Sequence, residues 1–173
     1  MIALGILDIK KFMSAFLIGP LFDDYTMVEA QITTFCTISI DGRYLRSFYE
    51  ERSAAPGTDT AVSAEGDVEY IAWKQIKERC FDMIKGRRTP LFFKFVFFFP
   101  KNQIPRLFQT YGVSVSPETI SGLCLNLRYD GNNLVLTTGS SMKVFSMDRS
   151  ADHAWDEYVR DLMIQNSILT ENL

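Results

Sequence analysis

Apolar and polar positions alternate with two different periods in the first part of the chain. Residues 2–6 alternate as a short strand does, and residues 9–17 repeat apolar side chains at the three- and four-residue spacing of an amphipathic helix, with Asp8 placed to cap it. A β-branched run over residues 28–40 meets Asp41-Gly42, and a second run follows over residues 44–49. Asp-Gly between two such runs predicts a hairpin that turns at Asp41-Gly42.

The second part of the chain repeats this alternation. A helical pattern begins near Tyr70, with Gly86 placed to end it, and a Phe-rich run over residues 92–98 predicts a central strand buried on both faces. The remaining elements that the pattern predicts are a helix at 102–111 ended by Gly112, a strand at 120–129, a turn at Asp130-Gly131, strands at 134–138 and 142–147, and a helix around Trp155.

Both parts read strand, helix, strand, Asp-Gly, strand, and then a helix that begins Ala-Trp, at Ala72-Trp73 and Ala154-Trp155. Internal duplication explains this order, and chance matching of short motifs is the alternative. We therefore expect one α+β domain over residues 1–173, built from related β-α-β-β halves at 1–86 and 87–169, with an antiparallel sheet and helices on one side. Residues 50–67 are rich in Ser, Ala, Gly and Pro and predict a flexible surface loop.

Two resemblances follow from particular motifs. Residues 93–147, through Lys94-Phe95-Val96-Phe97 and the two strands around Asp130-Gly131, resemble one repeat of the bacterial processivity clamp, the ring that holds a DNA polymerase on its template. The N-terminal half departs from that repeat. The whole chain resembles an uncharacterised family of small proteins in Firmicutes bacteria, through Ile32-Thr33-Thr34-Phe35 and the segment 84–91. This second resemblance implies no activity and no catalytic residues.

Composition removes several classes of function. The 173 residues carry 18 Lys and Arg against 21 Asp and Glu, a net charge of −3, so no global cationic field favours nucleic acid. The chain has three widely spaced cysteines, Cys36, Cys80 and Cys124, and a single histidine, so we expect no bound metal and no cofactor. We expect the three thiols to be buried and reduced. The apolar N-terminus lacks a basic stretch and no run is long enough to span a bilayer, so we expect a cytoplasmic protein with no membrane contact.

Basic residues provide the main candidate sites, because no nucleotide-binding, nucleophile or metalloprotease motif occurs. The acidic cluster at Asp23 fits a solvated loop, and the one around Asp156 fits the start of a helix. Lys85, Arg87 and Arg88 end a group of six basic residues within fifteen positions and are candidates for binding phosphate or a partner; the alternative is the polar face and end of a helix. The other members of that group are Lys74, Lys77 and Arg79.

A second basic set is a candidate nucleic-acid face. Lys10, Lys11, Lys101 and Arg106 lie on the two short helices that face DNA in a clamp-like arrangement, which requires helices 8–17 and 102–111 to pack side by side. With no catalytic constellation, the sequence favours a non-enzymatic binding or assembly module with an unknown protein partner or self-association. The alternatives are an enzyme acting on a phosphorylated small molecule through residues 85–88 and a clamp-like, DNA-associated protein.

Overall fold

The computed structural model describes residues 1–45, 47–48, 69–143 and 147–173, so the predicted loop at 50–67 lies outside the described residues. Seven strands form one antiparallel sheet in the order β3-β2-β4-β5-β6-β1-β7. The strands are β1 Ala3–Ile6, β2 Thr26–Thr33, β3 Thr37–Asp41, β4 Phe92–Phe98, β5 Ile120–Tyr129, β6 Leu134–Met142 and β7 Thr170–Asn172.

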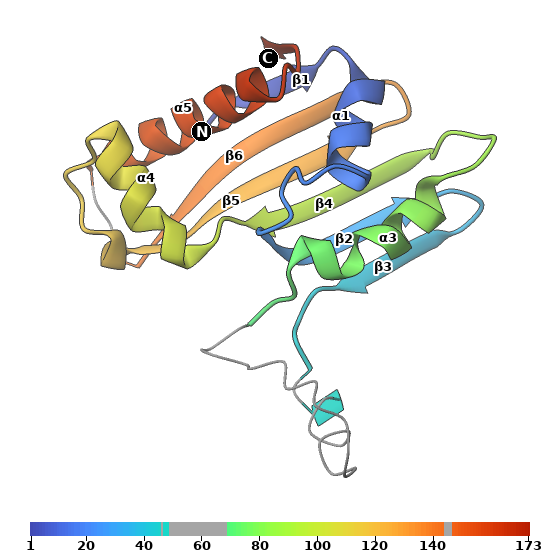
Figure 1. Ribbon diagram of the computed structural model, residues 1–173, viewed down its shortest axis with the longest axis horizontal. Coiled ribbons are helices and arrows are strands. Elements are labelled where there is room, and N and C mark those ends of the chain that lie inside the picture. Colours follow the sequence, from blue (N-terminus) through green and yellow to red (C-terminus); the bar gives the residue numbers. More distant parts are fainter. Residues whose placement is uncertain (46, 49–68, 144–146) are drawn as a thin grey trace.

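Four helices of the described part lie on the same face of this sheet (Figure 1). They are α1 Ile9–Leu17, α3 Trp73–Ile84, α4 Ile104–Tyr111 and α5 Ser150–Gln165, with 3₁₀ turns at Lys101–Gln103 and Pro117–Thr119. The predicted α+β class with an antiparallel sheet and helices on one side is therefore confirmed.

Strand β4 lies inside the sheet, between β2 and β5, as the Phe-rich run predicts. Its burial alternates, however: Phe93, Phe95 and Phe97 are buried beneath the helices, whereas the residues between them, including Lys94, are only half-buried on the opposite face. The prediction of a strand buried on both faces is wrong, because all four helices cover the same side.

The first hairpin turns at a different place from the one predicted. β2 and β3 pair from Glu29 opposite Asp41 to Thr33 opposite Thr37, so the chain reverses at residues 34–36, where Thr34 N donates to Cys36 O. Asp41-Gly42 instead ends β3: Gly42 N donates to Val28 O, and a Cβ at Gly42 would lie 1.8 Å from the oxygen of Met27. Glycine is needed there for a close approach of two backbones.

The structure also decides several other predictions. The hairpin at Asp130-Gly131 is confirmed, with Gly131 at a φ of 97°, and Gly112 ends α4 in the left-handed region as expected. Gly86 does not cap α3, since the helix ends at Lys85 in an extended conformation. Of the second run at 44–49, the described residues do not continue the sheet, because 44–45 lie in no strand and 47–48 are helical.

Cysteine burial also departs from expectation at one position. Cys80 is buried and Cys124 half-buried, but Cys36 is exposed at the unexpected β2–β3 turn. Burial raises the pKa of the Cys80 thiol to about 12, so this group stays protonated at neutral pH.

An aromatic cluster joins the helices to the sheet. Trp73 is fully buried and stacks on Phe16 of α1 with ring centroids 4.6 Å apart, while its edge meets Phe95 and Phe97 of β4. Trp155 of α5 is equally buried, so both tryptophans are core residues as predicted. This cluster fixes where α1 and α3 lie relative to each other and to the strand beneath them.

The end of α1 depends on side chains from α3. Pro20 stands four residues after Phe16 and has no N–H, so the Phe16 carbonyl has no donor at the usual helical position. The indole Nε1 of Trp73 donates to that oxygen at 3.1 Å, and Lys77 Nζ donates to Gly19 O at 2.9 Å and pairs with Asp23 at 2.6 Å. The lysine charge also complements the carboxyl end of the α1 dipole.

The two halves share their order of elements but not their pairing. β4 pairs with β5 of its own half, whereas β1 pairs with β6 and β7. Helices α1 and α4 do not pack side by side: α1 contacts α3, and α4 contacts α5 at the other end of the sheet (Figure 1). Duplication of residues 1–86 and 87–169 stays a prediction.

Candidate functional site

Most of the basic group around α3 is already paired within the protein. Lys77 pairs with Asp23, and Lys74 lies 3.6 Å from Asp24, so two helix lysines join α3 to the segment that follows α1. Arg79 donates to a backbone carbonyl of its own helix, that of Gln75. For these residues the interpretation as the polar side of a helix is sufficient.

The end of the group behaves differently. Lys85 pairs with Asp82 at 2.6 Å and lies over the Phe81 ring, with both charged side chains mostly in solvent. Arg87 and Arg88 are exposed, and neither has a carboxylate within salt-bridge distance among the residues that the structure describes. Residues 85–89, hereafter the basic segment, therefore present two guanidinium groups that no acid in the described part of the chain neutralises.

One side of the basic segment faces a groove beneath α1, hereafter the α1 groove, with a volume of about 420 Å³. Its floor is apolar, with Phe93 and Tyr129 stacked at 5.0 Å and Met13, Phe81 and Ile84 around them. Four cations stand on its rim: Lys10 from α1, and Lys85, Arg87 and Arg88.

The other side of the basic segment faces a second groove of about 710 Å³, hereafter the hairpin groove. It lies between the end of α3 and the β2–β3 hairpin, and Phe35, Ile38 and Leu91 supply much of its apolar surface. The residues from Ile84 to Thr89 line both grooves, so the basic segment is the ridge that separates them.

The chemistry of the α1 groove is that of recognition. Its lining includes no Asp, Glu, His or Cys, and its tyrosine, Tyr129, donates its hydroxyl to Gly131 O at 2.7 Å. The described lining thus offers cations and apolar carbon but no carboxylate or imidazole to move a proton at neutral pH. An anionic ligand with an apolar part fits such a surface.

The second predicted basic set is not brought together. Lys10 joins the rim of the α1 groove, whereas Lys101 and Arg106 lie at the opposite end of the sheet with α4. Arg106 lines a separate cavity of about 350 Å³ between α4 and α5, where the Tyr111 hydroxyl donates to Asp161 at 2.6 Å. The arrangement expected for a shared nucleic-acid face is therefore wrong, because α1 packs on α3 rather than on α4.

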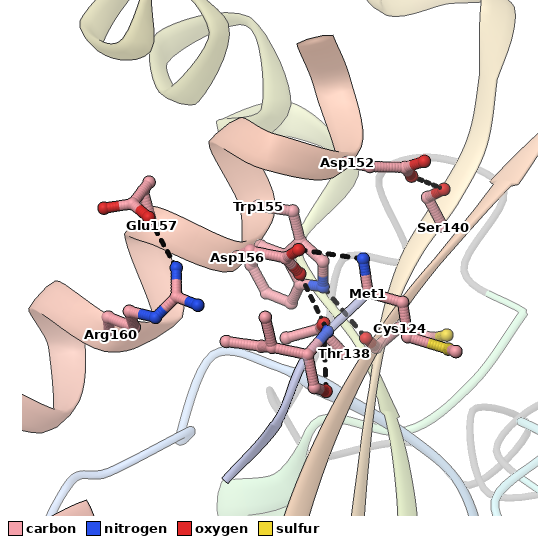
Figure 2. A network of polar contacts seen from close by, with 10 residues as sticks. Met1, Cys124, Thr138, Ser140, Asp152, Trp155, Asp156, Glu157 and Arg160 are labelled. Carbon is pink, nitrogen blue, oxygen red and sulfur yellow. Dashed lines mark hydrogen bonds and ion pairs between the residues drawn. The ribbon is translucent and has the colours of Figure 1, made fainter. Parts of the chain in front are cut away.

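A buried polar network was missed by sequence reasoning (Figure 2). Asp156 of α5 is buried, accepts a hydrogen bond from the Thr138 hydroxyl and forms an ion pair with the Met1 ammonium at 2.8 Å. Ser140, two residues along β6, donates to Asp152, one turn earlier in α5. The interpretation of this acidic group as the first turn of a helix does not hold for Asp156, which lies past the first turn of α5 and is buried. The network ties α5 to the sheet.

The described residues contain neither a metal-binding cluster nor a helix that could span a membrane. No group of three or more His, Cys, Asp or Glu residues there has an arrangement that holds a metal ion. In the same part of the chain, no helix combines the length and the apolar character that crossing a membrane requires.

Comparison with known proteins identifies a family without a known activity. No curated protein and no solved structure shows significant similarity to the chain. One family model, described as "Family of unknown function (DUF5721)", matches residues 15–171. The matched range includes α1 from Ala15 onward, the basic segment, the lining of the hairpin groove and the lining of the α1 groove from Leu17 onward. Since this match spans nearly the whole sequence, the chain belongs to the DUF5721 family of unknown function.

Proposed function

We propose that this protein is a non-enzymatic binding module whose α1 groove takes an acidic segment of a partner protein. One observation carries the proposal: among the described residues, Arg87 and Arg88 have no carboxylate partner, and they stand on the rim of an apolar groove whose described lining contains no acid. An occupant that places carboxylates on the rim and an apolar side chain on the floor complements both properties.

The rim and the floor contribute differently to such binding. Exposed ion pairs contribute about 0.2–1 kcal/mol each, so the cations mainly orient the segment and raise its association rate. A buried aromatic or aliphatic anchor contributes about 2 kcal/mol or more, which makes the floor around Phe93 and Tyr129 the main source of affinity. We therefore expect moderate affinity that decreases as salt concentration rises.

An enzyme acting on a phosphorylated small molecule through Lys85, Arg87 and Arg88 is the runner-up. The same three cations favour it, since guanidinium groups bind phosphate well. It would need a proton-transferring group beside the phosphate site, and the α1 groove lining offers none at neutral pH. Organic phosphates added to the purified protein, with thermal stability as the readout, separate this alternative from the module.

A clamp-like, DNA-associated role also stays an alternative, resting on the resemblance of residues 93–147 to a clamp repeat in a bacterial protein. It loses support because Lys10 and Lys11 lie apart from Lys101 and Arg106. Duplex DNA is therefore included as a competitor in the test below.

The proposal is tested by selecting random 16-residue peptides displayed on phage against the immobilised protein. We expect enriched peptides to carry acidic residues next to a bulky apolar residue. The double variant Arg87→Glu/Arg88→Glu should lose this enrichment, whereas Lys101→Glu/Arg106→Glu, the same change of charge at the other end of the sheet, should retain it.

Three results would contradict the proposal. The first is equal enrichment of acidic peptides on the wild type and on Arg87→Glu/Arg88→Glu. The second is stabilisation by an organic phosphate that Arg87→Glu/Arg88→Glu abolishes, which would favour the enzyme. The third is displacement of the selected peptides by duplex DNA at low salt, with loss of DNA binding in Lys101→Glu/Arg106→Glu, which would favour the clamp-like role.

A further inference from the structure

We propose that the partner segment crosses the basic segment and fills both grooves, so that its sequence carries acidic residues between two apolar anchors. This inference rests on the proposed function, because it takes an acidic partner segment as the occupant. It adds the hairpin groove to the site and specifies the order of side chains in the partner.

The two grooves share the basic segment as a common wall. Ile84, Lys85, Gly86, Arg87, Arg88 and Thr89 line both of them. An occupant held on the α1 side by Arg87 and Arg88 therefore already lies against the ridge whose other side faces the hairpin groove. Their volumes, about 420 and 710 Å³, lie in the range of roughly 300–1,000 Å³ that is usual for ligand sites.

Each groove presents apolar side chains to solvent. Ile18, which lines the α1 groove, is 67% exposed, and Phe35 and Leu91, which line the hairpin groove, are 96% and 66% exposed. Large apolar side chains concentrated on both sides of one ridge are the compositional feature of an interaction surface rather than of scattered exposure. Two anchors, one in each groove, would cover them.

Charge places the acidic residues of the partner in the middle. Asp82 lies in the hairpin groove and pairs with Lys85, so a carboxylate deep in that groove would meet a negative charge. The guanidinium groups of Arg87 and Arg88 belong to the ridge and have no such neighbour among the described residues. Carboxylates of the partner are therefore best placed over the ridge, with apolar side chains before and after them.

A peptide fits this surface better than a lipid bilayer does. Both apolar surfaces are hollowed and separated by a charged ridge, so side chains can enter them singly, whereas a flat membrane would contact the ridge first. An extended segment advances about 3.3 Å per residue, so a 16-residue peptide has ample length to span both grooves. Anionic vesicles serve as the competing outcome in the test.

The test uses the most enriched acidic peptide, synthesised with a fluorescent label, and measures its affinity for the full chain by anisotropy. Ile18→Asn removes an apolar contact of the α1 groove, and Phe35→Ser removes one of the hairpin groove. We expect each to weaken binding at least tenfold, the loss typical of an interface anchor. Ile164→Asn is the matched control, because Ile164 is 72% exposed on α5 and lines neither groove.

The peptide itself provides the second readout. Replacing its apolar residue on one side of the acidic stretch should remove the effect of Ile18→Asn, and replacing the residue on the other side should remove the effect of Phe35→Ser. Circular dichroism melts of both protein variants should match the wild type, since both side chains are mostly in solvent.

The outcomes separate the two proposals. Binding that Ile18→Asn weakens and Phe35→Ser leaves unchanged would overturn the two-groove inference and leave the proposed function in place. Binding insensitive to Arg87→Glu/Arg88→Glu would overturn both. Phe35-dependent binding of vesicles containing 30% phosphatidylserine, without any effect of Phe35→Ser on the peptide, would assign the hairpin groove to a membrane and also overturn the inference.

Discussion

Replacing Trp73 with Phe tests the proposed dependence of α1 on α3. The change removes the donor to the Phe16 carbonyl, which has no backbone donor four residues on because residue 20 is proline. A buried carbonyl left unpaired costs about 1–3 kcal/mol, and the smaller ring adds about 1–2 kcal/mol through lost packing. We therefore expect the free energy of unfolding to fall by about 2–5 kcal/mol.

Trp155→Phe is the matched control. Trp155 is as buried as Trp73 and donates to Cys124 O at 3.0 Å. Successive carbonyls of a strand point to opposite neighbouring strands. Leu123 O accepts a hydrogen bond from Phe99 N on the β4 side, so the next carbonyl, that of Cys124, points towards β6. In Trp155→Phe this carbonyl therefore still has a backbone partner in the sheet. This variant should lose only the packing contribution, about 1–2 kcal/mol.

Urea denaturation measures both changes. The chain has two tryptophans, so each variant keeps one indole as its fluorescence probe. Equal destabilisation by Trp73→Phe and Trp155→Phe, at equal dependence on urea, would refute the argument that the Phe16 carbonyl relies on the indole N–H.

Three further outcomes follow from individual residues. A thiol reagent should label the exposed Cys36 rapidly in the folded protein. It should label Cys80 only on unfolding, because Cys80 is buried and burial raises its pKa to about 12. Rapid labelling that persists in Cys36→Ser would contradict this. Gly42→Ala should destabilise the protein by about 3 kcal/mol or more in thermal melts, since its Cβ would meet a backbone oxygen. Gly86→Ala should change stability by less than about 0.5 kcal/mol, because its Cβ would come no closer than 4.0 Å to its nearest neighbour, the oxygen of Arg88. Backbone N–H donors lower the pKa of Asp130 in the folded state. The stability that this carboxylate contributes is therefore present above its unfolded pKa and is lost as pH falls through the folded pKa. If the stability of Asp130→Ala ran parallel to that of the wild type from pH 6 to pH 2, this reasoning would be contradicted.

Local pattern predicted the elements whose signals are complete within a few residues. Helix α1 begins after its Asp8 cap, whose side chain accepts from Lys11 N, and β5 turns into β6 at Asp130-Gly131. The β2–β3 turn was missed because Thr34-Phe35-Cys36 contains none of the residues that usually mark a turn. Strand β7 is three residues long and was missed for lack of any periodic signal.

The site was predicted only in part, for a related reason. Exposure of Arg87 and Arg88 follows from their place after a helix, but the grooves depend on which elements pack together. Lys10 reaches the rim because α1 lies on α3, a long-range contact set by Trp73, and neither sequence spacing nor charge predicts it. Asp156 lies in the first half of a helix, where acids are usually solvated, and its burial depends on Thr138 of a strand.

The place of β1 in the sheet has a consequence for how the chain folds during its synthesis. β1 pairs through Ala3 with Thr137 of β6 and through Leu4 with Asn172 of β7. At about 5–20 residues per second, β1 waits roughly 10–30 s on the ribosome before both neighbours have been made. Until β6 has been made, β5 has an unprotected edge and β1 has no neighbour in the sheet. The nascent chain is therefore a substrate for chaperones, and closing the sheet with β1 is predicted to be a late step of folding.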